Sequence, residues 1–147
     1  MPNEIDFKSP VEAGFSFEKP VRLSVDDISE FATLSGDLNP LHHKARIAGA
    51  SRFGGIIASG THSGSLLMGS VATYLAPGFL TLGLSFELEF RAPVRPGIEL
   101  LIHWEVKTVE PKPSLAGYIV TVEGGIADKG KDLAWCRGAC LIVNEST

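Results

Sequence analysis

The chain has 147 residues, of which 44% are hydrophobic and 20% are charged, and this length and composition suit a single globular domain spanning residues 1–147. The net charge of -4 and the scattered basic residues argue against a nucleic-acid-binding protein, because phosphate backbones require a dense Lys and Arg surface. The N-terminus lacks the apolar core of a signal peptide, and glycines and a proline interrupt the longest uncharged stretch, residues 53–86, so we expect no membrane span.

The first half of the chain predicts one strand followed by helices. Residues 15–24 have the pattern of an opening strand, and Ser24 followed by acidic residues is typical of a helix start, because side-chain oxygens and early carboxylates stabilise that end. Apolar residues at helical spacing continue this helix until Gly36, a residue type that commonly ends helices. A short helix is expected over residues 44–51.

A longer apolar helix follows, with Ser59 as its N-cap and Gly60 as its first residue, and it ends before Pro77. Several glycines and serines lie among its leucines. Because glycine in a helix costs about 1 kcal/mol relative to alanine, their repeated use indicates a backbone that other elements approach closely. We therefore expect this helix to lie buried inside a curved sheet.

The second half of the chain alternates apolar and polar residues with period two and predicts four long strands. These lie within residues 80–94, 98–110, 115–127 and 132–144. The turns between them are short, which favours an antiparallel meander. Together with the first strand, this order predicts an α+β fold in which about five antiparallel strands wrap around one long helix.

Cys136 and Cys140 lie four residues apart in the last predicted strand. An extended segment separates them by roughly 13 Å, which is too far for a disulfide. We therefore expect free thiols and, by default, a cytoplasmic protein. Their spacing gives no support to a metal site, and none is predicted.

The sequence GDLNPLH at residues 36–42 is the strongest functional signal in the chain. It has the features of an ordinary turn, because Asp and Asn side chains fold back on the backbone and proline restricts the residue before it. A turn does not require the histidine, however. The alternative is that Asp37 and His42, held by the proline bend, converge on one small reactant as an acid–base pair.

The segment FATLSGDLNPLH, the SRFGGIIASG stretch before the long helix and the APVRPG turn together resemble the MaoC-like dehydratases and R-specific enoyl-CoA hydratases of the hotdog-fold superfamily. The resemblance covers the chain from about Val21 to Val143. It implies a hydro-lyase that interconverts a trans-2-enoyl-CoA and an (R)-3-hydroxyacyl-CoA without a metal or redox cofactor. It also implies a homodimer with the acyl-CoA thioester site near the subunit interface, and a dimer of dimers as a further assembly.

The resemblance assigns roles to the motif residues. It implies that Asp37 and His42 hold one water, with Asp37 as the base and His42 orienting the water and relaying a proton. Asn39 is expected to set the loop geometry and to contact the substrate. Gly60 is expected to hold the developing oxyanion, because a helix N-terminus presents unpaired N–H groups and a partial positive charge. Ser59, a further substrate-binding candidate, stands where many hydratases of the family carry a histidine, which leaves the preferred substrate open.

The other histidines have simpler interpretations. His43 is interpreted as a surface or turn residue and His62 as a satisfied polar residue near the helix start. His103 and its neighbour Trp104 point to opposite faces of a strand, so that one of the pair faces the helix. Five basic residues are either contacts for the coenzyme A phosphates or ordinary surface charge: Lys44, Arg46, Arg52, Arg91 and Arg95.

Two other functions remain open from the sequence. A hotdog thioesterase would use an acid to activate water against the carbonyl carbon, and free thiol would be released. A non-catalytic acyl-CoA or acyl-carrier-protein binding module would bind the thioester without turnover.

Overall fold

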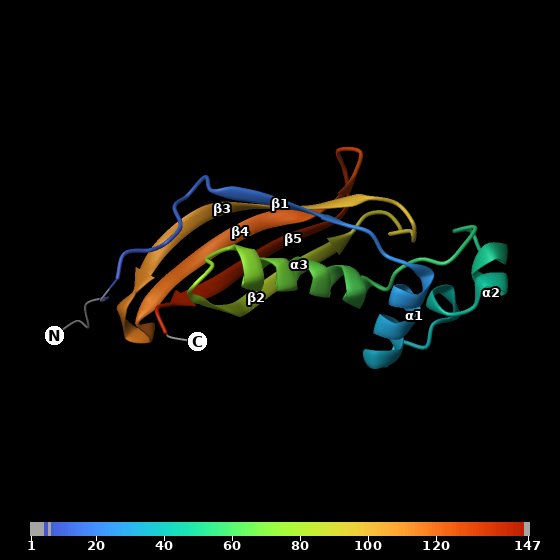
Figure 1. The fold of residues 1–147 in the computed structure, drawn as a ribbon, viewed down its shortest axis with the longest axis horizontal. Helices are drawn as coiled ribbons and strands as arrows, with labels where there is room; N and C mark the ends of the chain where they lie inside the picture. Colours follow the sequence, from blue (N-terminus) through green and yellow to red (C-terminus); the bar gives the residue numbers. More distant parts are fainter. Residues whose placement is uncertain (1–4, 6, 146–147) are drawn as a thin grey trace.

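A computed structural model describes residue 5 and residues 7–145. Within these residues, a five-stranded antiparallel sheet curves around one long helix, as the sequence predicted (Figure 1). The strands are β1 (Ser16–Val21), β2 (Leu80–Phe90), β3 (Leu100–Lys112), β4 (Gly117–Asp128) and β5 (Lys131–Val143). The helices are α1 (Val25–Leu34), α2 (Ala45–Ala50) and α3 (Gly60–Tyr74), and short 3-10 turns cover Pro40–His42 and Pro113–Leu115.

The strand order is β1-β3-β4-β5-β2, so the predicted four-strand meander is correct only for β3, β4 and β5. A meander would place β2 beside β3, but β2 pairs with β5 at the opposite edge. The reason lies in the connection of residues 91–99, which runs past the helical side of the molecule. There the Ala58 N–H donates to Val94 O and the Gly97 N–H donates to Leu23 O, each at 2.8 Å. This long connection separates the two strands, whereas a tight hairpin would have kept them paired.

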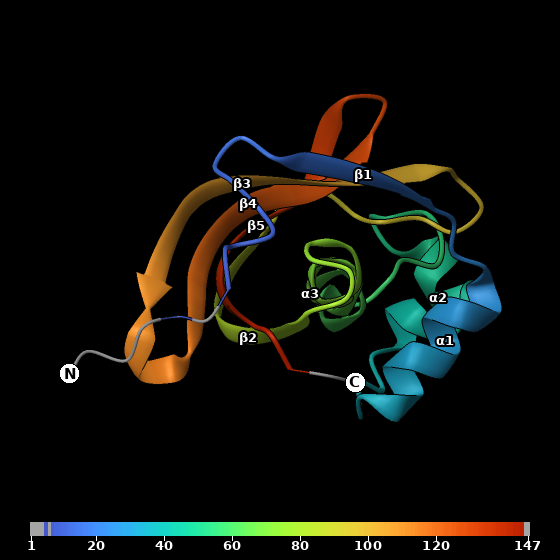
Figure 2. The ribbon, with the colours of Figure 1, turned by 60° about the vertical axis from the view of Figure 1, so that its left-hand side comes forward.

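Helix α3 lies inside the curve of the sheet (Figure 2). Leu67 and Val71 are 0% and 1% exposed, and Trp104 Nε1–H on β3 donates to Ser70 Oγ on α3 at 2.9 Å. Trp104 therefore faces the helix. His103 lies on the opposite face of β3, where its Nε2 is 2.6 Å from Asp132 Oδ1. The predicted alternation of His103 and Trp104 is therefore confirmed.

Two glycines of α3 are contacted by side chains from β2, which confirms the predicted close approach of other elements to this helix. The Phe90 ring rests on Gly60 and Leu88 rests on Gly64, where an added Cβ would come within 3.0 Å and 2.8 Å of these side chains. Gly69, in contrast, has open space around it and lies on an exposed face. The prediction of a buried helix therefore holds for only one face of α3 in this chain.

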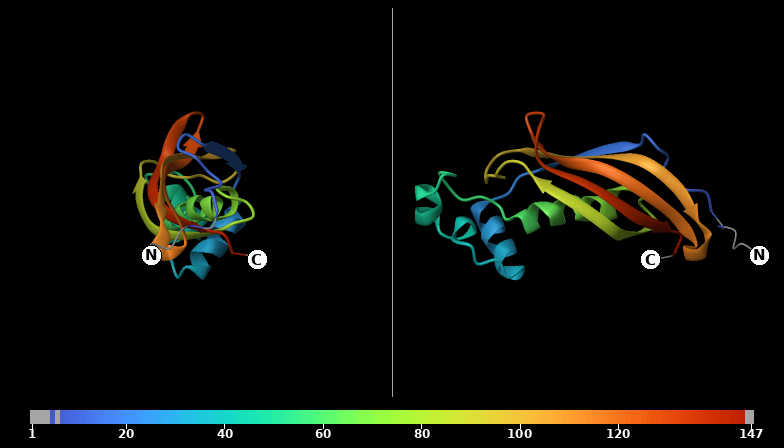
Figure 3. Two further views of the ribbon diagram at one scale, coloured as in Figure 1. Left: turned by 90° about the vertical axis from the view of Figure 1, so that its left-hand side faces the viewer. Right: turned by 180° about the vertical axis from the view of Figure 1, so that it is seen from behind.

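Helices α1 and α2 lie beyond one end of the sheet, on the side where α3 begins (Figure 3). The predicted start of α1 is confirmed as a capping box, because Ser24 Oγ accepts from the Asp27 N–H at 3.0 Å and the Asp27 carboxylate accepts from the Ser24 N–H at 2.8 Å. Ile28 and Ala32 bury the inner face of α1. The end of α1, and the GDLNPLH sequence after it, therefore lie beside the start of α3.

Both cysteines are buried and unpaired, as predicted. Burial raises the pKa of the Cys136 thiol to about 12 and that of the Cys140 thiol to about 11, so both stay protonated and pack as small apolar groups. In the part of the chain that the structure describes, no helix is both long enough and apolar enough to cross a membrane. The cytoplasmic location stays a prediction.

The contact between α1 and α3 encloses a histidine. The His62 ring stacks on Phe31 with the ring centroids 4.3 Å apart and the planes 5° apart, and His62 is 5% exposed. Its Nδ1 has no hydrogen-bond partner among the described residues, so the prediction of a satisfied polar residue is wrong. Burial lowers the pKa of His62 below its usual value, and the negative charge of Asp27 offsets only part of this effect.

The buried His62 predicts a loss of stability in acid. The folded state keeps this imidazole neutral while the unfolded chain accepts the proton, so the free energy of unfolding falls as the pH drops below about 6.5. We expect His62→Phe, which keeps the stack on Phe31, to raise the Tm by several degrees at about pH 5 and by less at about pH 8, as measured by thermal unfolding. A gain at the higher pH that equals the gain at the lower pH would contradict this account.

Candidate active site

The loop that carries the GDLNPLH sequence begins where α1 ends. Gly36 has a φ of +79°, its N–H donates to Thr33 O at 3.1 Å, and the Asp37 N–H donates to Ala32 O at 2.8 Å. This is the Schellman arrangement that glycine favours after a helix, because a left-handed backbone costs other residues energy. The predicted helix stop at Gly36 therefore also fixes the backbone of Asp37.

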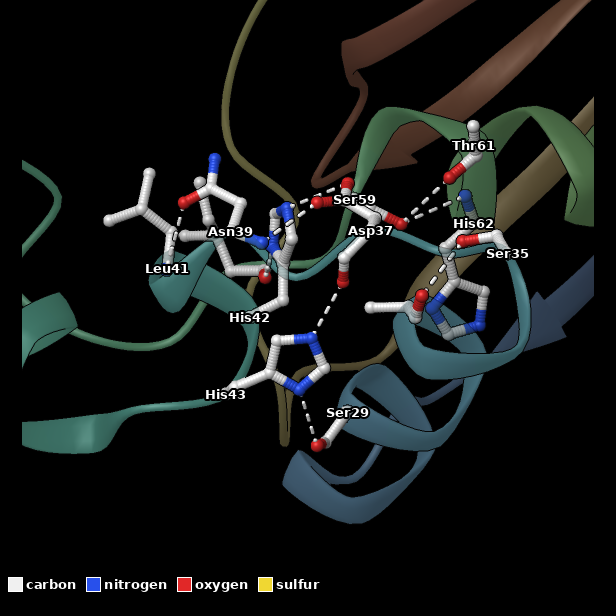
Figure 4. Close-up of polar contacts among 12 residues, drawn as sticks. Ser29, Ser35, Asp37, Asn39, Leu41, His42, His43, Ser59, Thr61 and His62 are labelled. Atoms are coloured by element: carbon white, nitrogen blue, oxygen red, sulfur yellow. Dashed lines mark hydrogen bonds and ion pairs between the residues drawn. The ribbon is translucent and has the colours of Figure 1, made fainter.

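The structure brings Asp37 and His42 together (Figure 4). Asp37 Oδ2 and His42 Nε2 are 3.3 Å apart. The other ring nitrogen, Nδ1, lies 2.7 Å from Ile57 O, and because a carbonyl oxygen only accepts, Nδ1 is the donor. Nε2 is therefore the nitrogen that faces the carboxylate. His42 is 5% exposed, whereas 33% of the Asp37 side chain is accessible.

Asn39 orders the loop between these two residues. Its N–H donates to Asp37 Oδ1 at 3.0 Å, and its own Oδ1 accepts from the Leu41 N–H at 3.1 Å. Pro40 then begins a single 3-10 turn that ends at His42, a position that suits its fixed φ. Because one carboxylate oxygen of Asp37 is held by this backbone contact, the other is directed toward His42.

His43 makes contacts that its sequence did not predict. Its N–H caps the 3-10 turn, so it is a turn residue as expected, but its half-buried ring connects the loop to α1 and does not simply face solvent. The Nε2 atom lies 2.7 Å from Asp37 O and the Nδ1 atom lies 2.9 Å from Ser29 Oγ. Of the two interpretations of His43, a surface or a turn residue, the structure confirms the turn residue.

Helix α3 begins beside this loop, and Gly60 is its first residue. Ser59 is the N-cap as predicted: its Oγ accepts from the His62 N–H at 3.3 Å and shares a hydrogen bond with Thr61 Oγ1 at 3.0 Å. Ser59 is 1% exposed and does not line the neighbouring cavity. Its hydroxyl is engaged in the helix cap, and its role as a substrate-binding residue stays a prediction.

A cavity of about 440 Å³ opens between the loop, the start of α3 and the adjoining ends of β2 and β5. Three of the predicted site residues line it: Asn39, His42 and Gly60. Asp37 is absent from the lining and stands next to it through its contact with His42. The apolar part of the wall includes Leu41, Phe53, Ile57, Phe90 and Leu133. The cavity thus combines a few polar groups with an apolar wall, as small-molecule sites do.

Sequence reasoning missed the aromatic wall and the way it is held. Phe53 is fixed by Arg95, whose guanidinium donates to Phe53 O at 2.6 Å, and Phe90 is placed by its contact with Gly60. Arg91 also lines the cavity, and its Nε pairs with Glu89 at 2.8 Å. Only the glycine at the helix start hinted at a bulky neighbour, because the other contacts join residues that are distant in the sequence.

The polar groups in and beside the cavity suit proton transfer and the stabilisation of an oxyanion. They are an acid–imidazole pair, an amide side chain and the N-terminus of a helix. Within residue 5 and residues 7–145, no three His, Cys, Asp or Glu side chains gather in a geometry that would hold a metal ion.

The sequence and the structure are both similar to known proteins. The family model described as "MaoC like domain" matches residues 6–123. The chain is 32% identical over 115 residues to the 3-hydroxybutyryl-CoA dehydratase of Methylorubrum extorquens, with 78% of this chain and 73% of that protein covered. It is 32% identical over 124 residues to the (R)-specific enoyl-CoA hydratase of Aeromonas caviae, with 82% of this chain and 92% of that protein covered.

Solved structures give the same result. R-hydratase PhaJ1 from Pseudomonas aeruginosa matches with a TM-score of 0.78 at 29% identity, over 93% of this chain and 85% of that chain. The (R)-hydratase from A. caviae matches with a TM-score of 0.78 at 27% identity, over 94% of this chain and 100% of that chain. The hotdog fold predicted from the sequence is confirmed, and both curated relatives carry the names of lyases, the enzyme class that was expected. The chain belongs to the MaoC-like domain family.

Proposed function

We propose that this protein adds water to a trans-2-enoyl-CoA to form an (R)-3-hydroxyacyl-CoA, and that it catalyses the reverse dehydration. The observation that carries this proposal is the Asp37–His42 pair beside a cavity whose wall contains the start of α3 at Gly60. Two relatives at 32% identity are named for this chemistry, and one of them is named for the R configuration. The cytoplasmic location and the coenzyme A carrier are part of the same proposal.

The proposed reaction uses Asp37 Oδ2 and His42 Nε2 on one water molecule. Asp37 takes a proton from the water while the water oxygen bonds to Cβ of the enoyl group. The electrons of the double bond shift toward the thioester oxygen, which gives an enolate. Asp37 and His42 together then return a proton to Cα, so that one molecule of water has been added. Groups of this kind each contribute about 10²- to 10⁴-fold in rate. The addition of water is redox-neutral overall, and we propose that it needs no metal or redox cofactor.

The negative charge that gathers on the thioester oxygen requires a donor, and the N–H of Gly60 supplies it in this proposal. The first N–H groups of a helix have no partner within the helix and carry the positive end of its dipole. Ser59 Oγ caps the N–H of His62 and so leaves the first amide of α3 for a ligand. A donor aimed at such an oxyanion is worth roughly 3–4 kcal/mol.

We propose a short acyl chain as the preferred substrate. Phe90 and Leu88 rest on successive turns of α3, at Gly60 and Gly64. A second cavity of about 300 Å³ lies between α3 and β2 and is lined by Met68, among others. We propose that Phe90 and Leu88 separate the two cavities, so that the active-site cavity ends before the space that a longer acyl chain would need. The relative named 3-hydroxybutyryl-CoA dehydratase supports this choice.

We propose a homodimer as the active assembly, and a dimer of dimers as a further assembly that would use a second surface. Strand β2 is an edge strand of 11 residues, and Leu82 and Leu84 on it are 51% and 49% exposed. An exposed apolar edge invites pairing with another strand. A second copy that pairs its own β2 about a twofold axis would cover both edges at once.

Asp37→Asn tests the proposed chemistry. The amide keeps the shape that accepts the Asn39 N–H but cannot take a proton, so we expect the hydration rate on crotonyl-CoA to fall by about 10²- to 10⁴-fold with a Tm within a few degrees of the wild type. Asp132→Asn is the matched control, because Asp132 also pairs with a histidine but lies outside the cavity. Full hydration by Asp37→Asn would contradict the proposal. Thiol release by the wild type would indicate a thioesterase instead, and binding without turnover a binding module.

Leu88→Ala tests the acyl-chain limit. Shortening this side chain removes its contact with Gly64, and we expect the two cavities to join along α3. We expect the kcat/KM ratio for trans-2-octenoyl-CoA over crotonyl-CoA to rise by about tenfold or more, a difference of about 1.4 kcal/mol. Leu101→Ala is the control: it removes the same atoms from the face of β3 that points away from α3, and it should leave the ratio unchanged. If the ratio of Leu88→Ala equals that of the wild type, the acyl chain does not pass Leu88 and the proposed limit is wrong.

Leu84→Glu tests the dimer. A carboxylate on each of two paired β2 strands would bring like charges into the apolar contact, so we expect the variant to sediment as a single chain where the wild type sediments as two. A wild type that sediments as one chain at micromolar concentration would contradict the proposed assembly.

A further inference from the structure

The loop that carries Asp37 is held on its outer side by the second of two consecutive histidines. We propose that His43 is a positioning residue that sets Asp37 in place for the reaction. This inference rests on the proposed function, because it assumes that the Asp37 carboxylate moves a proton. His43 has no access to the reacting atoms through its own ring, since it binds the backbone of Asp37 and not its carboxylate.

The His43 ring makes two hydrogen bonds, and the one to Asp37 O identifies a donor nitrogen. Asp37 O can only accept, so Nε2 carries a hydrogen and donates across 2.7 Å. Nδ1 of the neutral ring then has a free electron pair, which accepts from the Ser29 hydroxyl across 2.9 Å. The hydrogen bonds from Ser29 to His43 and from His43 to Asp37 therefore connect α1 with the backbone carbonyl of Asp37 (Figure 4).

Packing alone does not hold this part of the loop. Leu38, the residue after Asp37, is 76% exposed, and a third of the Asp37 side chain is open to solvent at 33%. Hydrogen bonds must therefore supply the restraint. The N–H of Asp37 is anchored to Ala32 O and its Oδ1 to the Asn39 N–H, and His43 anchors the remaining backbone group, the carbonyl.

The rings of His42 and His43 point away from each other and make different contacts. Their centroids are 6.4 Å apart and their planes are inclined at 70°. His42 reaches toward Ile57 and the cavity, while His43 reaches toward Ser29 on α1. Asp37 thus lies between two imidazoles, one at its carboxylate and one at its carbonyl. The 3.3 Å separation of Asp37 Oδ2 and His42 Nε2 depends on both contacts, and a shift of about 1 Å in such a pair can cost 10²-fold in rate.

Four variants test the positioning role with crotonyl-CoA as the substrate. His43→Ala should lower kcat by about 10- to 100-fold while KM changes by less than about threefold, because the substrate contacts remain and only the reacting pair moves. His43→Gln should restore most of kcat, since its amide presents a donor and an acceptor at nearly the spacing of the two ring nitrogens. Ser29→Ala should lower kcat by less, and Ser29→Ala combined with His43→Ala should be no slower than His43→Ala alone, because both act along one path.

The control and the contradicting outcomes are distinct. His103→Ala removes another imidazole that pairs with an acid outside the cavity, and it should leave kcat unchanged. A kcat of His43→Ala equal to that of the wild type, or a loss that His43→Gln does not repair, would overturn the inference. If His43→Ala fails to fold, Ser29→Ala decides: an unchanged kcat contradicts the positioning role. An inactive Asp37→Asn beside a fully active His43→Ala would refute only this inference, whereas an active Asp37→Asn would refute the proposed function itself.

Discussion

The hydrogen bond from His42 Nδ1 to the carbonyl oxygen of Ile57 is the constraint on which the rest of the site depends. It fixes the ring so that Nε2 faces Asp37, and it joins the loop after α1 to the segment that leads into α3. The N–H of Ile57 donates back to Leu41 O at 3.2 Å, and the next N–H, that of Ala58, donates to Val94 O on the connection between β2 and β3. The Asp37–His42 pair and the start of α3 are therefore held by the same short stretch of backbone.

The contacts that shape the fold also shape the cavity. Phe90 and Leu88 on β2 pack on the glycines of α3 and so attach the edge strand to the helix, and Phe90 is at the same time part of the cavity wall. Gly60 takes part in both: it admits the ring of Phe90, and it lines the cavity at the start of the helix. The wall of the cavity and the packing of the edge strand thus share the side chain of Phe90, because the cavity lies where the sheet and the helix end.

Local signals in the sequence predicted much of this arrangement. Ser24, Gly36 and Ser59 each act on neighbouring backbone groups, so their roles as helix start, helix stop and N-cap followed from residue type and spacing. What the sequence did not predict depends on distant residues. The partner of His43 is 14 positions away on α1, and the pairing of β2 with β5 depends on a long connection. His62 Nδ1 lacks a hydrogen-bond partner among the described residues because α1 and α3 pack around it.

A single stereochemical measurement tests the central claim most directly. One Asp37–His42 pair on one side of the substrate must deliver both the hydroxyl group to Cβ and the proton to Cα, so the two should add to the same face. When crotonyl-CoA is hydrated in deuterium oxide, proton NMR of the product should show one deuterium at C2, on the same face as the new hydroxyl group, with no free thiol. Addition to opposite faces, or release of coenzyme A without a hydroxyacyl product, would contradict the account.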